Sequence, residues 1–282
     1  MPVGQPGRGD RAEARAPISP PNPWLQLLEH RLPFELGALV AASPALRLLG
    51  RGDRHPVLVL PGFTGSDAST QPLRWAIRSW GYWAHGWGLG RNLGPSPSVV
   101  AGLTGRLEQL HRRHEAKVSL VGWSLGGIYA RELARRFPDR IRQVITLGSP
   151  FRMVEGDRSS ASRLADQIMP NMADEISSLM RMSIDEPSKP PLPVPSTAIY
   201  TRTDGVVRWH TCIDTVSEFH ENVEVQGSHS GLGFNPSVLF VIADRLAQPV
   251  NDWRRFNPPP LLRALFPRPA SWADEAPKRR SA

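Results

Sequence analysis

Short apolar runs alternate with longer helical patterns from His55 to Gln248. The first run, residues 56–60, is apolar throughout and ends at Pro61 and Gly62, as is typical of a strand buried on both faces of a sheet. Further strands are expected at residues 82–85, 117–121, 141–147, 197–201 and 222–225, and helices at residues 71–80, 99–114, 125–137 and 236–247. Strands that alternate with helices predict a mostly parallel sheet with helices on both faces, which is the α/β class.

Runs of proline mark the boundaries of this pattern. Six of the 29 prolines fall in residues 1–23, five in residues 187–195 and six after Asn257. Proline clusters of this kind are typical of loops and tails. We therefore expect a disordered arm at 1–23, a helical preface at 24–50, one domain at 51–250 and a basic, proline-rich tail at 251–282.

One strand-to-helix junction has the form of a nucleophile elbow. The expected strand at 117–121 leads into Gly122, Ser124 and Gly126, and a helical pattern follows directly. The glycines leave room for a tight, strained turn that lifts the serine hydroxyl above the sheet. A helix that begins at Leu125 would direct its first N–H groups and its dipole towards a developing oxyanion. The pattern predicts Ser124 as nucleophile and the Leu125 N–H as an oxyanion donor; a glycine-rich strand end without chemistry is the alternative.

The second oxyanion donor is expected in the loop after the first strand. Residues 61–66 contain two glycines, which let the backbone approach a bound ligand closely. Phe63 follows the first of these glycines, so its N–H is the candidate donor, and its ring could form a wall of the acyl pocket. An ordinary glycine turn is the alternative for this loop.

A serine nucleophile needs a histidine as general base, and the histidine needs a carboxylate to orient it. Among the eight histidines, His229 follows a predicted strand, precedes the last helix and has small residues on both sides. These small neighbours leave room for the imidazole to turn towards Ser124. We therefore predict His229 as the general base.

The carboxylate is expected beyond the strand at 197–201. Asp204 lies in the stretch that follows this strand, and open parallel sheets bind their ligands at the carboxyl ends of strands. Asp214 is the rival candidate and Asp185 a weaker one. With Asp204 the order along the chain is serine, aspartate, histidine, which is the order of elbow-type triads.

From about His55 to Gln248 the chain resembles an α/β-hydrolase of the bacterial serine lipase and esterase branch, similar to lipase class 2. The residues that carry the resemblance are Pro61-Gly62-Phe63, Gly122-Trp123-Ser124-Leu125-Gly126-Gly127, Gly148-Ser149-Pro150, Asp204-Gly205-Val206-Val207 and Gly227-Ser228-His229-Ser230-Gly231-Leu232. The resemblance implies Ser124, Asp204 and His229 as the triad, with Phe63 and Leu125 as oxyanion donors. Pro61 departs from the pattern, because many relatives have histidine before the glycine.

A cluster of methionines indicates a cap over the site. All five methionines other than Met1 fall in residues 153–182, and methionine suits a surface that adapts to varied apolar ligands. We therefore expect residues 151–195 to form a helical cap or lid inserted into the domain. The residues expected to contact substrate are Met153, Met169, Met172, Met180 and Trp123, although the methionines could instead fill the core of the cap.

The net charge of +8, from 34 basic and 26 acidic residues, raises a polyanion as a partner. Half of this excess lies in the tail at 251–282, which holds seven basic and three acidic residues. The near-neutral remainder argues against nucleic acid, whereas the tail leaves contact with a membrane or lipid surface open. The single cysteine, Cys212, excludes an internal disulfide framework. Without an apolar export signal or span, we expect a cytoplasmic location.

These motifs predict an enzyme that hydrolyses carboxylic esters with apolar acyl groups, through an acyl-enzyme and without a cofactor or metal. An acyltransferase would use the same triad and pass the acyl group to an acceptor other than water. A non-catalytic binding module is the rival from a different class. The glycines of residues 86–94 have the wrong spacing and follow the wrong strand for a dinucleotide-binding loop.

Overall fold

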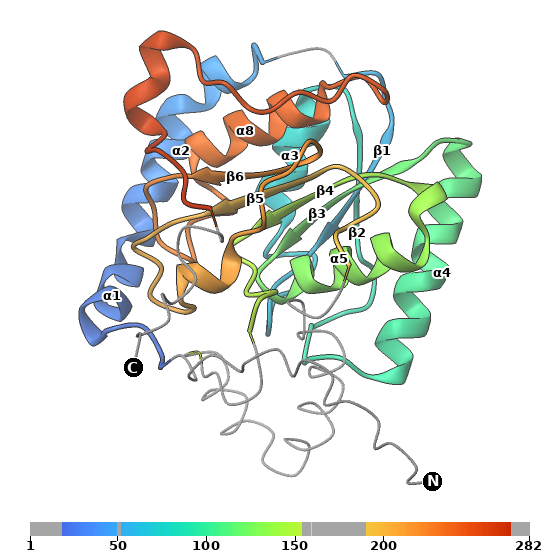
Figure 1. Cartoon of the computed structure of the whole chain (residues 1–282), viewed down its shortest axis with the longest axis horizontal. Coiled ribbons are helices and arrows are strands. Elements are labelled where there is room, and N and C mark those ends of the chain that lie inside the picture. The colour runs from blue at the N-terminus through green and yellow to red at the C-terminus, as the bar shows by residue number, and fades with distance from the viewer. Residues whose placement is uncertain (1–18, 50–51, 154–158, 160–189, 272–282) are drawn as a thin grey trace, which may run out of the picture.

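The computed structural model describes residues 19–49, 52–153, 159 and 190–271 of the chain (Figure 1). Six strands form one parallel sheet in the order β2-β1-β3-β4-β5-β6. They are β1 (Pro56–Leu60), β2 (Trp83–Gly86), β3 (Val118–Trp123), β4 (Ile141–Leu147), β5 (Ser196–Tyr200) and β6 (His220–Glu224). Each overlaps a strand predicted from the sequence, so the α/β prediction is confirmed.

Helices connect and precede these strands. They are α1 (Pro23–Leu27), α2 (Leu32–Leu46), α3 (Gln71–Ser79), α4 (Pro97–His114), α5 (Leu125–Arg136) and α8 (Pro236–Leu246), with 3-10 turns η1 (Leu28–Arg31), η2 (Pro138–Arg140), η5 (Trp209–Cys212) and η6 (Pro260–Leu265). Helices α3, α4, α5 and α8 lie where the helical patterns predicted them. The expected helical preface corresponds to α1, η1 and α2.

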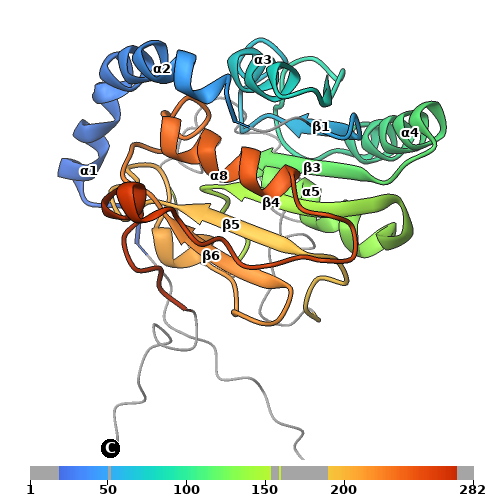
Figure 2. The ribbon, with the colours of Figure 1, turned by 90° about the horizontal axis from the view of Figure 1, so that it is seen from above.

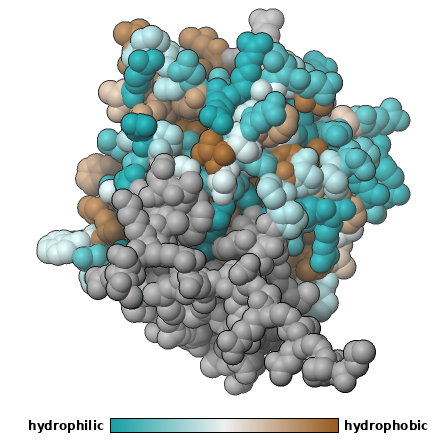
Figure 3. Space-filling view, viewed as in Figure 1, coloured by the Kyte–Doolittle hydropathy of each residue, from teal (hydrophilic) through white to brown (hydrophobic). Residues whose placement is uncertain are grey.

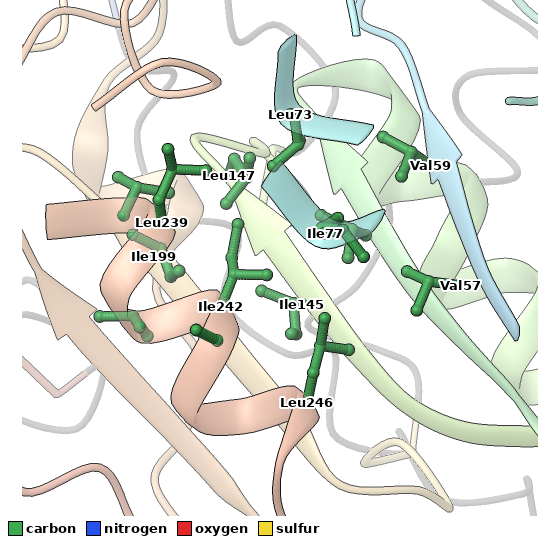
Figure 4. Packing of buried hydrophobic residues seen from close by; sticks show 14 of the residues in the cluster. Val57, Val59, Leu73, Ile77, Ile145, Leu147, Ile199, Leu239, Ile242 and Leu246 are labelled. Carbon is green, nitrogen blue, oxygen red and sulfur yellow. The ribbon is translucent and has the colours of Figure 1, made fainter. Parts of the chain in front are cut away.

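The core consists of two apolar layers on opposite faces of the sheet, because successive residues of a strand point to opposite faces. Val57 and Val59 of β1 belong to the layer that α3 and α8 cover, and Figure 4 shows both near Ile77 of α3. Leu58 and Leu60 of the same strand belong to the layer under α4 and α5. Figure 1 shows the strands between α3 and α8 on one side and α5 on the other, and Figure 2 looks onto the sheet with α8 in front of its strands. Burial on both faces explains why β1 is apolar at every position.

The strand order reverses between two neighbouring strands, β1 and β3. The connection that leaves β1 leads to the edge strand β2, whereas the connection that leaves β3 leads to β4 on the other side. The connections after β1 and β3 therefore lead to opposite sides of the sheet, and open sheets of this kind bind ligands at the carboxyl edge beside such a reversal. The loop after β1 carries Phe63, and Ser124 follows β3.

The N-terminal segment runs along one side of the sheet as α1, η1 and α2 (Figure 1). Leu39 and Ala42 of α2 pack against the core layer of α8, and Leu46 is buried there. The other side of the segment is exposed: Phe34 keeps 81% and Val40 72% of its surface accessible. Figure 3 shows apolar side chains at the surface on the side where α1 and α2 lie.

The C-terminal segment remains packed beyond the boundary expected at residue 250. Phe256 and Phe266 join the core layer of α8, with their ring centroids 4.9 Å apart. The Ala270 N–H donates to the Tyr200 hydroxyl at 2.7 Å, and the Asn222 side chain donates to the Ala270 carbonyl at 3.0 Å. Residues 256–270 therefore pack against β5, β6 and the core layer of α8.

Candidate active site

Ser124 occupies a strained turn between β3 and α5. Its φ of 52° and ψ of −120° lie outside the regions that an ordinary residue adopts, at a cost of about 1–3 kcal/mol. The Ser124 N–H donates to the Leu147 carbonyl of β4 at 2.8 Å, which continues the sheet pairing into the turn. Leu125 is the first residue of α5, so the N-terminal N–H groups of this helix, which have no acceptor within it, begin beside the serine.

The elbow glycines are required by close backbone contacts. A Cβ atom on Gly126 would lie 2.3 Å from the Leu60 carbonyl oxygen of β1, and one on Gly122 would lie 2.4 Å from the Gly126 oxygen. Neither backbone atom can move without displacing a strand or the first turn of α5. The sequence pattern around Ser124 thus reflects the contact of α5 with β1 and β3.

Asp204 and His229 form a buried hydrogen-bonded pair. The His229 Nδ1 lies 2.6 Å from Asp204 Oδ2, and the other carboxylate oxygen accepts the Val206 and Val207 N–H groups at 2.8 Å each. Asp204 follows β5 and His229 follows β6, so both come from the carboxyl edge of the sheet. An ionised carboxylate accepts the proton of Nδ1, and this leaves Nε2 as the basic nitrogen.

The surroundings of His229 favour its charged form. Burial alone would lower the pKa of the imidazole, but the charge and hydrogen bond of Asp204, together with the charge of Glu29, outweigh burial and raise the pKa above its ordinary value. An imidazole in this environment is stabilised once it has accepted a proton.

Glycines allow the loops that follow five of the strands to meet at the carboxyl edge of the sheet. A Cβ atom on Gly148, which follows β4 with a φ of 54°, would lie 3.0 Å from His229 Nδ1 and 3.3 Å from Asp204 Oδ2. A Cβ atom on Gly62, which follows β1, would lie 3.2 Å from the Ser124 Cβ. The structure therefore gathers the loops after β1, β3, β4, β5 and β6 around Ser124, Asp204 and His229.

The loop that carries Phe63 is held by Asn92. The Asn92 side chain donates to the Pro61 carbonyl at 2.8 Å, and its backbone pairs with Thr64 and Gly65 at 2.6 and 2.7 Å. Asn92 is fully buried, and sequence reasoning missed it. The glycine-rich stretch at 86–94, rejected as a nucleotide loop, thus supports the expected oxyanion loop.

Trp123, predicted to bind substrate, contacts the His229 loop. Its indole N–H donates to the His229 carbonyl at 3.1 Å, and its ring meets the Phe234 ring edge-on at a centroid distance of 5.7 Å. Gly233 lies against the indole, because a Cβ atom there would come within 2.6 Å of the ring. The indole therefore holds the backbone of His229 in place.

Of the four methionines predicted to contact substrate, Met153 alone lies among the described residues. It is nearly buried in the apolar layer of α4 and α5, which also contains Leu125 and the half-buried Phe63. Met169, Met172 and Met180 lie outside the described residues, as do Asp185 and most of the expected cap at 151–195.

The rival acid Asp214 is engaged elsewhere. Its carboxylate lies 2.8 Å from the Arg131 guanidinium and 3.5 Å from that of Arg152, and all three side chains are buried. Burial raises the pKa of Asp214, but the charges and hydrogen bond of these arginines more than offset this and lower it. Asp214 therefore serves as the anion of a buried ion-pair cluster.

A second Ser-His-Asp arrangement lies at the amino edge of the sheet. His55 Nε2 is 2.8 Å from the Ser119 hydroxyl, and His55 Nδ1 is 2.5 Å from Asp53. Ser119 lies within β3 and has no exposed surface. Burial and the Arg142 charge lower the pKa of His55 to about 4. Asp53 is exposed, but Ser119 and His55 are buried, so a substrate cannot reach the Ser119 hydroxyl. Hydrogen-bond geometry between three side chains therefore does not by itself identify the nucleophile.

Three charged side chains of the N-terminal segment reach the loops that carry Asp204 and His229. Glu29 and Glu35 accept backbone N–H groups of these loops, and Arg31 donates to the Thr203 hydroxyl at 2.8 Å. Sequence reasoning missed all three, since charged residues in a short helical segment are usually solvated.

Within residues 19–49, 52–153, 159 and 190–271, no group of three or more His, Cys, Asp or Glu side chains could hold a metal ion. No helix of this described part is long and apolar enough to cross a membrane.

No family model matches the chain. A stretch of 56 residues, 20% of the chain, is 39% identical to part of the biotin biosynthesis bifunctional protein BioHC of Teredinibacter turnerae. That stretch spans 10% of the length of BioHC.

Solved structures resemble most of the chain. The mature form of Bacillus licheniformis lipase BlEst2 gives a TM-score of 0.53 at 17% identity, over 70% of this chain and 94% of that one. A structure reported with the metagenome-derived lipolytic enzymes LipS and LipT gives 0.52 at 21% identity, again over 70% and 94%. The likeness shows that the chain has the α/β-hydrolase fold, as the motifs implied.

Proposed function

We propose that this α/β-hydrolase-fold protein hydrolyses carboxylic esters with apolar acyl groups, using Ser124 as nucleophile, His229 as general base and Asp204 as the orienting acid. The observation that carries the proposal is the 2.6 Å contact between His229 Nδ1 and Asp204 Oδ2 at the sheet edge where Ser124 occupies its strained turn. The solved structures named above, described as a lipase and as lipolytic enzymes, support the reaction class.

Acylation begins with proton transfer from the Ser124 hydroxyl to His229 Nε2 while Oγ attacks the ester carbonyl carbon. The carbonyl oxygen becomes an oxyanion, which accepts hydrogen bonds from the Leu125 and Phe63 N–H groups. The carbon–oxygen bond to the alcohol then breaks, and the imidazolium returns the proton to the leaving alkoxide. Asp204 stabilises the imidazolium throughout and stays ionised.

Deacylation repeats these steps with water as nucleophile. His229 Nε2 takes a proton from the water, whose oxygen attacks the acyl carbon. Collapse of the second oxyanion releases the carboxylic acid, and the proton returns to Ser124 Oγ. The overall change is one ester and one water converted to one acid and one alcohol.

The apolar acyl group is proposed from the side chains around the oxyanion donors. Phe63, Leu125 and Met153 belong to one apolar layer at the side of α4 and α5. An acyl chain bound beside these side chains would exchange water contacts for apolar ones, at about 0.8 kcal/mol for each CH₂ group buried. We therefore expect kcat/KM to rise with acyl length across short nitrophenyl esters until the pocket is filled.

The test compares the wild-type protein with two serine variants on these esters. Ser124→Ala removes the nucleophile, and we expect its kcat to fall at least 10³-fold, with a Tm near that of the wild type. Ser119→Ala removes the buried serine of the second Ser-His-Asp arrangement; we expect a lower Tm but a wild-type kcat for each folded molecule.

Loss of activity in Ser119→Ala with activity kept in Ser124→Ala would overturn the proposal. Product analysis with a competing alcohol separates hydrolysis from acyl transfer, because both share the acyl-enzyme. We expect free acid as the main product; a predominant new ester would identify an acyltransferase.

A further inference from the structure

One carboxylate of the N-terminal segment bridges the two loops that carry the acid and the base. Glu29 Oε1 accepts the Gly205 N–H and the His229 N–H at 2.9 Å each, and Oε2 accepts the Ser230 N–H at 2.8 Å. Gly205 follows Asp204 directly, and Ser230 follows His229. The backbone on both sides of the Asp204–His229 hydrogen bond is therefore tied to the same side chain.

Glu29 binds these groups as an anion. Partial burial raises the pKa of this carboxyl, but the three backbone N–H groups outweigh it and lower the pKa below the ordinary value. Hydrogen bonds to an ionised acceptor are roughly twice as strong as neutral ones. The negative charge of Glu29 also raises the pKa of His229, after the larger effects of burial, which lowers it, and of Asp204, which raises it.

Two further side chains of the same segment hold the same loops. Glu35 accepts the Ser228 N–H at 2.7 Å and the Ser228 hydroxyl at 2.5 Å. Arg31 donates to the Thr203 hydroxyl and to the Gly227 carbonyl, and it lies 3.7 Å from the Glu35 carboxylate. The segment thus contacts both sequence neighbours of Asp204 and both sequence neighbours of His229.

The glycines beside the triad fit this docked segment. A Cβ atom on Gly205 would lie 2.2 Å from the Leu25 carbonyl oxygen of α1, and one on Gly231 would lie 1.5 Å from Glu35 Oε2. Both glycines belong to the motifs around Asp204 and His229. A side chain at either position would clash with the docked N-terminal segment.

We propose that the N-terminal segment Pro23–Leu46 is part of the catalytic apparatus, and that Glu29 is a positioning residue that fixes the distance between Asp204 and His229 and stabilises the imidazolium by its charge. The inference rests on the proposed function, since it assigns Glu29 a role in that reaction. Glu29 touches neither substrate nor the reacting atoms and acts through the two loops.

The test is Glu29→Gln, which keeps the size of the side chain but removes its charge and replaces one acceptor oxygen by an amide NH₂. Small displacements of reacting groups cost up to about 100-fold in rate, so we expect kcat to fall roughly 10- to 100-fold with KM nearly unchanged. Without the Glu29 charge the pKa of His229 falls. The acidic limb of the profile of kcat/KM against pH should therefore move to lower pH. Glu29→Asp keeps the charge and should retain the wild-type position of this limb.

Two variants control for loss of packing. Glu108→Gln changes the same side chain at a pair with Arg140 away from the site, and should leave kcat and the pH profile unchanged. Glu35→Gln weakens the contact with Ser228, so we expect a lower Tm. The acidic limb of the profile of kcat/KM against pH should stay at its wild-type position. The charged groups facing His229 are Asp204 and Glu29, while Arg31 and Glu35 pair with each other beside the neighbouring residues.

An NMR titration of the His229 imidazole in the Ser124→Ala background provides a readout that needs no turnover. A lower His229 pKa in Glu29→Gln supports the inference. An unchanged pKa and an unchanged kcat would overturn it, provided that the wild-type protein hydrolyses esters and reacts with a fluorophosphonate. A wild-type protein that does neither would refute the proposed function, and the titration would still report on Glu29.

Discussion

At the scale of single residues, the proposed chemistry depends on which nitrogen of His229 carries the proton. Asp204 Oδ2 holds Nδ1 at 2.6 Å, and its Oδ1 is occupied by two backbone N–H groups. The carboxylate is therefore fixed in one orientation before any substrate binds. Because Oδ2 accepts the proton of Nδ1, Nε2 is the nitrogen that would take the proton of Ser124 in the proposed reaction.

We predict that Asp204→Asn lowers kcat/KM roughly 10³- to 10⁴-fold, because an amide can donate to Nδ1 and so leave the proton on Nε2. The measurement is steady-state hydrolysis of a short nitrophenyl ester. The matched control is Asp214→Asn, which weakens the ion pairs with Arg131 and Arg152; it should lower Tm and keep most of the kcat. A larger activity loss in Asp214→Asn would mean that the wrong carboxylate was assigned.

The raised pKa of His229 gives a second prediction at this scale. As the proposed base, His229 works only when neutral, so we expect kcat/KM to fall as pH drops through a value above the ordinary histidine pKa of about 6.5. The folded protein also holds this proton more tightly than the unfolded chain. The stabilisation by His229 is thus fully present below about pH 6.5 and is lost as pH rises through the folded pKa. A pH–rate profile with its acidic limb well below 6.5 would contradict this account.

At the scale of elements, the elbow results from contact between α5 and two strands. Gly122 and Gly126 lie where α5 meets β3 and β1, and both contacts are to backbone atoms. The strand, the turn and the helix were all predictable because their signals are local in sequence. The contacts of Asn92 with the loop after β1 were not predictable, since a buried asparagine in a glycine-rich loop has no distinctive pattern.

We predict that Gly126→Ala lowers the free energy of unfolding by about 3 kcal/mol or more, because its Cβ would lie 2.3 Å from the Leu60 oxygen and must displace backbone. Esterase activity should fall with it, since the turn that presents Ser124 would move. Gly105→Ala in α4 is the control. Nothing lies within 4 Å of its added Cβ, and alanine in a helix should stabilise by about 0.5–1 kcal/mol. Denaturant unfolding of both variants measures the difference; equal stabilities would refute the steric argument.

At the scale of the whole molecule, segments from both ends of the chain complete the domain. The sheet and its covering helices followed from the alternation of residues 55–248, whereas the roles of the flanking segments did not. Glu29 meets Gly205 and Ser230 across 176 and 201 residues, and nothing in the local sequence distinguishes it from a solvated glutamate. Contacts between residues so far apart in the sequence leave no local pattern, so they can be identified only from the folded structure.

We predict that Phe266→Ala lowers the free energy of unfolding by about 3 kcal/mol, because the ring is nearly buried against Phe256 and lies 6.1 Å from the Phe240 ring of α8. Leu261→Ala is the matched control within the same segment. Leu261 is 96% exposed, so its loss should change stability by less than about 0.5 kcal/mol. Similar Tm values for the two variants would show that residues 256–270 do not belong to the folded domain.

The identity of the nucleophile is the central claim, and labelling tests it most directly. The folded wild-type protein is treated with a fluorophosphonate ester, digested, and analysed by mass spectrometry. We expect one adduct per molecule, on the peptide at Ser124, with loss of esterase activity in proportion to labelling. An adduct on another residue, or an active protein that takes no label, would contradict the account.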